Sequence, residues 1–184
     1  MKLLFIGDSL IEYFDWQERF PKDAVYNMGI AGEMVETMYS RIEVVYRQVD
    51  QVEAIFIMSG INNLAAGDKK FIPVYQKAVR KLKEHYSSGI FVQSLLPVFF
   101  PWISNDDIRE VNEKLKRMTE EEDVSYLDIY SLFLEVSGDI KKEYLLDDGV
   151  HVSGEGYKVW SNEIEGVLKK HREDIRQKLV NRIQ

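Results

Sequence analysis

Four short segments of the sequence hold the residue types that acyl transfer needs. Ser9 follows Gly7 and Asp8, directly after the apolar run of residues 3–6. A hydroxyl at such a strand-to-helix turn is presented at the edge of a sheet, where it can act as a nucleophile if a base lies beside it. The more common role of a serine after such a strand is to cap a helix or contact a phosphate. Catalysis by this serine therefore requires a base from elsewhere in the chain.

The best candidate for that base is one of three histidines. His85 and His171 lie in Lys- and Glu-rich segments, which are typical of exposed helix surfaces. His151 differs, because it follows Asp148 by three residues in a loop that contains a glycine. At this spacing the carboxylate can bind Nδ1 of the imidazole and leave Nε2 to accept a proton from the serine. The same hydrogen bond can also simply close a turn, and Asp147 is an alternative orienting carboxylate.

Acyl transfer also places negative charge on the carbonyl oxygen, so a site needs hydrogen-bond donors aimed at it. Gly32 can present its backbone N–H at close range because no Cβ shields it, and Asn62 can donate from its side-chain amide. Each has a common alternative role, since a loop glycine often serves a positive φ and a loop asparagine a turn. Their combination with the serine and histidine is what favours an oxyanion hole.

These segments, in this order, resemble the sequence blocks of the SGNH hydrolases, also called the GDSL family of esterases and lipases. The blocks span residues 7–160 and are Gly7-Asp8-Ser9-Leu10, Asn27-x-Gly29-x-x-Gly32, Gly60-Ile61-Asn62 and Asp148-Gly149-Val150-His151, the last followed by Ser153, Gly156, Tyr157 and Trp160. The resemblance implies a hydrolase with Ser9 as nucleophile, His151 as base and Asp148 as its orienting carboxylate. It implies oxyanion donors from the backbone of Ser9 and Gly32 and from the Asn62 side chain. It implies no metal and no other cofactor.

The chain departs from the family pattern in the third block. Asn63 stands where the family often has an aspartate. A neutral amide donates as well as accepts hydrogen bonds and carries no charge, so we expect different bonding around this loop. The sequence also has no Gly-x-Ser-x-Gly motif at the serine, which argues against an α/β-hydrolase.

Strand-length apolar runs alternate with segments of helical period, a pattern typical of a parallel sheet built from βαβ units. The predicted strands are residues 3–6, 24–28, 54–58, 90–95 and 124–127. Apolar residues at helical spacing predict core-facing helices along Met34, Met38, Ile42, Val45 and Val49, along Val74, Ala78, Leu82 and Tyr86, and along Ile108, Val111, Leu115 and Met118. Ser104 is among the candidate N-caps of the third.

The fold class that we predict is α/β. The resemblance implies a flavodoxin-like three-layer α/β/α sandwich, for which we expect a five-stranded parallel sheet in the order 2-1-3-4-5. We expect residues 1–184 to form a single domain, with a helix from about residue 153 to the end of the chain. Ligands of such sheets bind outside the carboxyl ends of the strands, which is where the candidate residues fall.

Composition narrows the function further. The 184 residues include 24 Lys and Arg against 31 Asp and Glu, a net charge of −7, so binding to nucleic acid is not expected. The absence of Cys excludes disulfides, thiol catalysis and Cys-ligated zinc, and agrees with a reducing compartment. No apolar stretch approaches the roughly 18 residues of a membrane span. We expect a cytoplasmic protein, and the sequence leaves its oligomeric state open.

Aromatic residues near the candidate site suggest a substrate wall. Phe99 and Trp102 follow the fourth predicted strand and either line the substrate crevice or anchor a buried loop. Tyr13, Phe14 and Trp16 either line the crevice or fix the first helix to the sheet. Asp8 is a further candidate for substrate contact, because it precedes the nucleophile. The expected substrate is a small carboxylic ester with a short acyl or O-acetyl group, with a thioester or lysophospholipid as variants. The alternative function is a non-catalytic flavodoxin-like module that binds a phosphate or acyl ligand.

Overall fold

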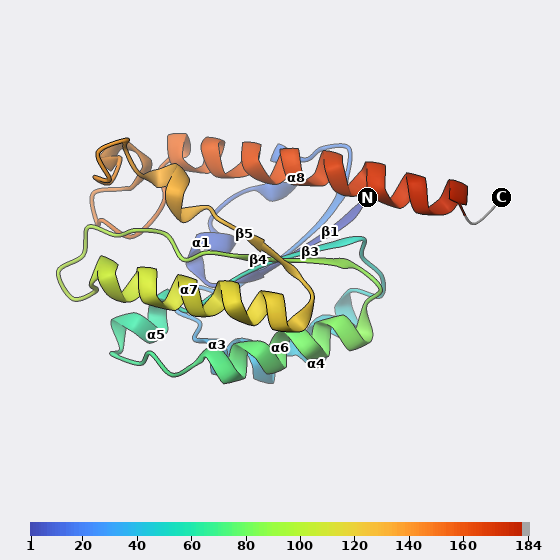
Figure 1. Cartoon of the computed structure of the whole chain (residues 1–184), viewed down its shortest axis with the longest axis horizontal. Helices are drawn as coiled ribbons and strands as arrows, with labels where there is room; N and C mark the ends of the chain where they lie inside the picture. The colour runs from blue at the N-terminus through green and yellow to red at the C-terminus, as the bar shows by residue number, and fades with distance from the viewer. Residues whose placement is uncertain (182–184) are drawn as a thin grey trace.

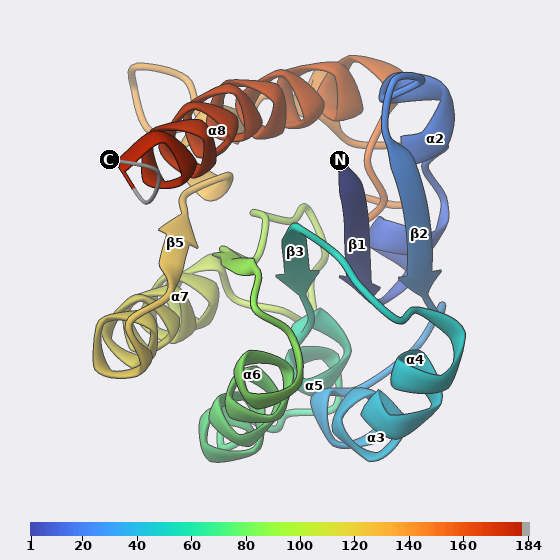
Figure 2. The same cartoon turned by 90° about the vertical axis from the view of Figure 1, so that its right-hand side faces the viewer.

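The computed structural model describes residues 1–181, apart from the side chains of Lys178 and Leu179. It contains a five-stranded parallel sheet in the order β2-β1-β3-β4-β5, which confirms the predicted order (Figure 2). The strands are β1 (Lys2–Gly7), β2 (Ala24–Gly29), β3 (Ala54–Met58), β4 (Gly89–Gln93) and β5 (Ser125–Leu127). The central strand β3 is buried along its whole length, as expected for a continuous apolar run covered on both faces.

Helices cover both faces of the sheet, which gives the predicted three layers (Figures 1 and 2). The helices are α1 (Ser9–Glu12), α2 (Trp16–Arg19), α3 (Val35–Ser40), α4 (Ile42–Gln48), α5 (Ile61–Ala65), α6 (Ile72–His85), α7 (Asn105–Glu122) and α8 (Gly154–Asn181), with short 3₁₀ turns at Tyr130–Phe133 and Lys142–Tyr144. One face carries α8 together with α2, and the other carries α3 to α7 (Figure 2). The short helix α1 contacts α8, since the Tyr157 hydroxyl donates to the Leu10 carbonyl oxygen at 2.8 Å.

A row of stacked phenylalanines aligns the three central strands. Phe5, Phe56 and Phe91 are register partners on β1, β3 and β4, and neighbouring rings lie 5.0 Å apart between centroids. Cross-strand aromatic pairs stabilise a sheet and fix its register. This shared register holds the carboxyl ends of the three strands level at one edge of the sheet.

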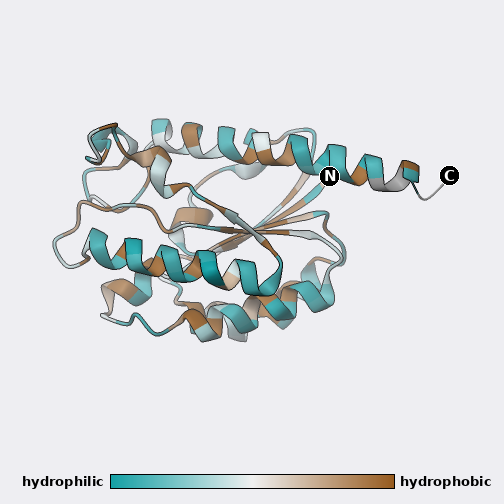
Figure 3. Ribbon diagram, in the orientation of Figure 1, coloured by the Kyte–Doolittle hydropathy of each residue, from teal (hydrophilic) through white to brown (hydrophobic). Residues whose placement is uncertain are grey.

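The apolar residues concentrate in the sheet and on the inner helix faces, while the outer faces are hydrophilic (Figure 3).

The predicted helix along residues 34–49 is divided. It breaks at Arg41, which ends α3 and begins α4. Met34 is the N-cap of α3 and is 37% exposed, so its predicted place in the core is wrong. A residue at the N-cap lies outside the helical turn, which removes it from the buried stripe. The prediction of Ser104 as an N-cap is confirmed, since its Oγ accepts a hydrogen bond from the Asp106 N–H at 3.2 Å.

The C-terminal helix α8 begins at Gly154, as predicted, and extends to Asn181, the last described residue. Residues 182–184, to which the predicted helix extends, lie outside the described residues. Trp160 anchors α8, because its buried indole donates to the Gln93 side-chain oxygen at 2.6 Å. Within residues 1–181, no helix has both the length and the apolar composition that a membrane crossing requires.

Candidate active site

Ser9 is placed by the turn between β1 and α1. It is the first residue of α1, and Asp8 caps the helix by accepting the Leu10 N–H at 3.0 Å. The turn requires Gly7, because a Cβ there would lie 1.9 Å from the Met58 carbonyl oxygen on the neighbouring strand. Ser9 is only 7% exposed, so the turn holds it largely buried at the carboxyl edge of the sheet.

His151 reaches Ser9 from the loop that precedes α8. Its Nε2 lies 3.1 Å from the Ser9 Oγ, and its Nδ1 lies 2.7 Å from the Oδ2 of Asp148. Gly149 has a φ of +73°, and a Cβ there would lie 2.2 Å from the Phe99 carbonyl oxygen, so the loop needs glycine at this point. The structure thus brings the predicted nucleophile beside the predicted base, which lies 142 positions later, and its neighbouring orienting carboxylate.

The local turn holds Asp148 in its charged form. Its Oδ1 accepts the backbone N–H groups of Val150 and His151, both at 2.9 Å. Burial would raise the pKa of Asp148, but these hydrogen bonds and the one from the imidazole outweigh it and lower the pKa to about 2. The carboxylate that bonds to His151 is therefore ionised at neutral pH. Asp147 is exposed, and the carboxylate that accepts the hydrogen bonds of His151 is that of Asp148.

The predicted oxyanion donors follow three adjacent strands. Ser9 follows β1, Gly32 lies in the loop after β2, and Asn62 lies in the first turn of α5 after β3. Gly32 has a φ of +75°. Within residues 1–181, the backbone N–H groups of Ser9 and Gly32 donate to no protein acceptor. The Asn62 amide donates one hydrogen to the Glu33 carbonyl oxygen at 3.0 Å, which leaves its second hydrogen for another acceptor.

Asp8 corrects one expectation. Its side chain has no exposed surface, so the predicted contact between Asp8 and a substrate is wrong. Burial raises its pKa to about 7, against the lowering effect of the Leu10 N–H, and the nearby Glu33 carboxylate raises it further. Its Oδ2 has no hydrogen-bond partner among the described residues. Asp8 is a buried acid beneath the nucleophile.

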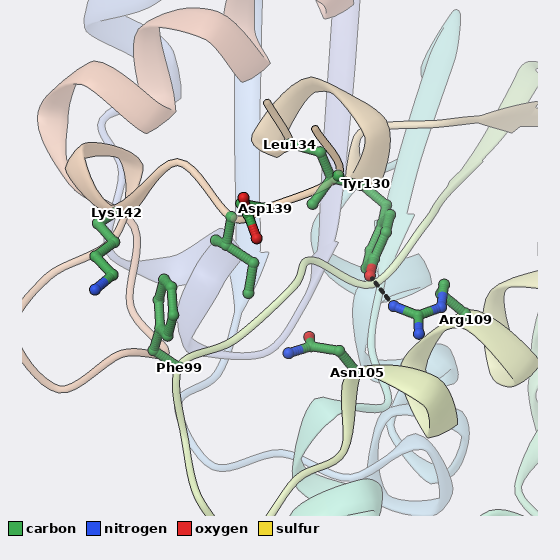
Figure 4. Close-up of a pocket in the computed structure, with 9 residues that line it drawn as sticks. Phe99, Asn105, Arg109, Tyr130, Leu134, Asp139 and Lys142 are labelled. Atoms are coloured by element: carbon green, nitrogen blue, oxygen red, sulfur yellow. Dashed lines mark hydrogen bonds between the residues drawn. The ribbon is translucent and has the colours of Figure 1, made fainter. Parts of the chain in front are cut away.

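The two aromatic residues of the predicted substrate wall, Phe99 and Trp102, are both exposed. Phe99 is 44% exposed, and its N–H donates to the Gly149 carbonyl oxygen at 2.7 Å, so its backbone lies against the histidine loop. Its ring borders a polar pocket of about 510 Å³ that also includes Arg109 and Lys142 (Figure 4). Trp102 is 77% exposed. Neither aromatic is therefore the buried loop anchor that we considered as an alternative.

Two residues beside the site, Glu33 and Arg41, carried no clear sequence signal. Glu33 is only 4% exposed and forms an ion pair with Arg41 next to the oxyanion donors. Tyr13, which we had considered both as a crevice residue and as a helix anchor, lies beside the imidazole of His151 with 5.3 Å between ring centroids. Trp16 is buried and packs in the core. Among residues 1–181, no group of three His, Asp or Glu side chains is arranged to hold a metal ion.

A flavodoxin-like sheet with this serine, histidine and asparagine at its carboxyl edge defines an esterase of the SGNH class. The chain belongs to the GDSL-like lipase/acylhydrolase family, whose sequence model matches residues 5–159. Hydrolysis of esters is the activity of this family. The family resemblance predicted from the four sequence blocks is confirmed.

Solved structures share the fold at low sequence identity. A protein of Streptococcus pneumonia, provisionally named a platelet activating factor, aligns with a TM-score of 0.82 and 24% identity over 90% of this chain and 83% of its own. A lipolytic G-D-S-L family protein from Veillonella parvula has a TM-score of 0.75 and 21% identity over 92% and 98%. An acetyl xylan esterase from Geobacillus stearothermophilus has a TM-score of 0.72 and 20% identity over 89% and 92%.

One curated relative is much longer than this chain. It is an N-acylneuraminate cytidylyltransferase from Escherichia coli, 28% identical over 172 residues, which are 91% of this chain and 40% of the relative. The chain thus spans about two fifths of that relative's length.

Proposed function

We propose that the protein hydrolyses small carboxylic esters through an acyl-Ser9 intermediate. Ser9 Oγ attacks the ester carbon while His151 Nε2 takes its proton, and Asp148 orients the imidazole and stabilises its charge. The backbone N–H groups of Ser9 and Gly32 and the Asn62 amide stabilise the resulting oxyanion. The intermediate collapses, and the leaving alkoxide takes the proton from His151. A water molecule, deprotonated by His151, then attacks the acyl-enzyme, and the second collapse releases the acid and restores Ser9.

The observation that carries this proposal is the continuous hydrogen-bond chain of 3.1 Å and 2.7 Å from Ser9 through His151 to Asp148. Both distances are within hydrogen-bonding range, and the first places Nε2 within reach of the Ser9 proton. A module that merely binds a ligand through the turn at Ser9 has no use for an imidazole aligned with an ionised carboxylate. The geometry therefore favours the hydrolase over the binding module.

We infer a short acyl group as the preferred acid part of the substrate. Ser9 is only 7% exposed, and the turns after β1 and β3 lead almost directly into α1 and α5, so little chain is present there to enclose a long acyl tail. The alcohol part is proposed to be a sugar. Two of the similar proteins, the acetyl xylan esterase and the N-acylneuraminate cytidylyltransferase, carry acylated sugars in their names. An O-acetylated sugar is the first natural substrate class to test.

The direct test is hydrolysis of p-nitrophenyl esters from acetyl to palmitoyl by the wild type, Ser9→Ala and His151→Ala. We expect turnover of the short esters and its loss in both variants, which should keep wild-type circular dichroism and melting temperature. Turnover by Ser9→Ala equal to the wild type, after removal of contaminating esterase, would refute the mechanism.

Covalent trapping separates the two functions when no model ester is cleaved. An organophosphonate should label Ser9 in the wild type but not in His151→Ala, because labelling needs the activated hydroxyl. Labelling without ester turnover would mean that Ser9 is an activated nucleophile but that the natural substrate has a different leaving group. The absence of both signals would favour the non-catalytic module.

A further inference from the structure

A buried ion pair adjoins the loop that carries Gly32. The carboxylate of Glu33 accepts two hydrogen bonds from Arg41, Nε to Oε1 and Nη2 to Oε2, each 2.5 Å long. The same guanidinium donates to the Met28 carbonyl oxygen at 2.7 Å. The side chains of Glu33 and Arg41 are 1% and 16% exposed. Arg41 therefore ties the end of β2 to the residue after Gly32.

The main chain of Glu33 is tied to the other oxyanion donor. Its carbonyl oxygen accepts a hydrogen from the Asn62 amide at 3.0 Å, which fixes the rotation of that amide. One residue thus adjoins Gly32 through the chain and holds Asn62 through its carbonyl oxygen. A displacement of Glu33 would move both donors relative to the nucleophile.

Other contacts hold the same loop. Within it, the Glu33 N–H donates to the Ile30 carbonyl oxygen at 3.1 Å, which restrains the Glu33 main chain but not its side chain. Two more contacts come from outside the loop. On one side of Gly32, the Ala31 N–H donates to the Glu12 carboxylate at 2.6 Å. On the other side, the Val35 N–H donates to the Asn63 side-chain oxygen at 3.0 Å. These contacts restrain the ends of the loop, but neither touches its centre at Glu33. The ion pair with Arg41 is what holds the Glu33 side chain there.

We propose that Arg41, through its ion pair with Glu33, is a positioning residue for the oxyanion hole. This inference rests on the proposed function, because it assigns a task to the same donors. A buried ion pair adds little net stability over an apolar pair of similar volume, since desolvation offsets much of the attraction. The planar guanidinium of Arg41 nevertheless fixes a two-point geometry that a lysine cannot reproduce. The pair should therefore affect the rate of the chemical step more than substrate binding.

The test compares Arg41→Lys with a matched control elsewhere in the protein. Arg80 also forms a bidentate pair, with Glu122, and its side chain is 56% exposed against 16% for Arg41. This pair joins α6 to α7 near the end of α7 that lies opposite the site. We expect Arg41→Lys to lower kcat for p-nitrophenyl acetate at least tenfold with KM changed less than twofold, because small misplacements of catalytic groups cost about 10²-fold. Arg80→Lys should leave kcat within twofold.

A second variant and a double-mutant comparison complete the test. Glu33→Gln preserves the side-chain size but removes the charge, and it should show the same selective loss of kcat. In an Asn62→Ala background, Arg41→Lys should lower kcat by a smaller factor than in the wild type, because one of the donors that it positions is gone.

Three results would overturn the inference. They are wild-type kcat in Arg41→Lys and Glu33→Gln, an equal kcat loss in Arg80→Lys, or an equal fold loss in both Asn62 backgrounds. If Arg41→Lys fails to fold, Glu33→Gln decides. Failure of the proposed function is distinguishable, because the wild type would then neither cleave esters nor be labelled by a phosphonate.

Discussion

The ring of Tyr13 lies against the imidazole of His151, with 5.3 Å between the centroids and a tilt of 34° between the planes. Tyr13 is the C-cap of α1, the short helix that begins with Ser9. The same helix therefore presents the candidate nucleophile and an aromatic neighbour of its candidate base. In the proposed mechanism the imidazole becomes positively charged as it takes the serine proton, and an aromatic face attracts a nearby cation.

We predict that Tyr13→Ala lowers kcat/KM for p-nitrophenyl acetate by about two- to fivefold. The reason is that cation–π attraction at an exposed site contributes about 0.5–1 kcal/mol, and Tyr13 is 60% exposed. Tyr13→Phe keeps the ring and should remain close to the wild type. Steady-state kinetics of the two variants provide the measurement. An equal loss in both would assign the effect to the hydroxyl and contradict this explanation.

We predict that Asp148→Asn lowers kcat by up to about 10⁴-fold without unfolding the protein. The Oδ1 of Asp148 accepts two backbone N–H groups, so an asparagine would keep its oxygen there and turn its NH₂ toward His151 Nδ1. That arrangement favours the tautomer with the proton on Nε2, which cannot accept the proton of Ser9.

The matched control for that prediction is Asp147→Asn, which removes the same charge one residue away. Asp147 is exposed and does not bond to the histidine, so this variant should retain kcat within about twofold. Comparable losses in the two variants would show that the net charge of the loop matters and not the orientation of His151.

Local motifs explain why much of this site could be predicted from the sequence. Asp148 and His151 lie three residues apart, and their contact depends on one short turn. Ser9 and Asn62 follow apolar runs that could only be buried strands, and parallel strands bring their carboxyl ends to one edge. The order of the strands then followed from the family resemblance.

The residues that could not be predicted depend on contacts between distant segments. Glu33 and Asn62 are 29 positions apart and meet only when the loops after β2 and β3 lie side by side. The burial of Asp8 results from helices on the faces of the sheet, and nothing in the Gly-Asp-Ser sequence distinguishes a buried acid from an exposed one. A charged residue in a loop is usually exposed, and the burial of Asp8 is an exception.

Asn63 shows what the departure from the family pattern achieves. It is fully buried, and its amide donates to the carboxylates of Glu36 at 2.9 Å and Asp68 at 3.1 Å, while its oxygen accepts the Val35 N–H at 3.0 Å. An aspartate in this place could not donate to either neighbour when ionised, and three carboxylates would share one site.

We therefore predict that Asn63→Asp lowers the free energy of unfolding by roughly 2–4 kcal/mol at pH 8. The loss should shrink toward pH 5, where protonation relieves the repulsion between the carboxylates. Urea denaturation at the two pH values measures this. Adding Glu36→Gln should restore part of the stability, because its amide removes one of the charges. An unchanged stability of Asn63→Asp at pH 8 would contradict the hydrogen-bond assignment.

The buried carboxyl of Asp8 makes the free energy of unfolding depend on pH. Burial raises the pKa of Asp8 from 3.8 to about 7. Below about pH 4 the carboxyl is protonated in both the folded and the unfolded chain. Between pH 4 and 7 only the unfolded chain ionises, so the unfolded state is favoured increasingly as the pH rises. The stability present at low pH is lost as the pH rises through about 7.

We predict that Asp8→Asn removes this dependence. Asparagine has the same shape, and its oxygen can still cap the Leu10 N–H, but it carries no charge at any pH. The variant and the wild type should differ little in unfolding free energy near pH 4. By pH 8 the variant should be more stable by up to about 4 kcal/mol, since each pKa unit corresponds to about 1.4 kcal/mol. Urea titrations from pH 4 to 8 measure the difference. Glu33 and His151, the charged neighbours of Asp8, are present in both proteins and do not cause the difference between them. If the unfolding free energies of the two proteins differed by the same amount at every pH, the pKa of Asp8 would not be raised by folding.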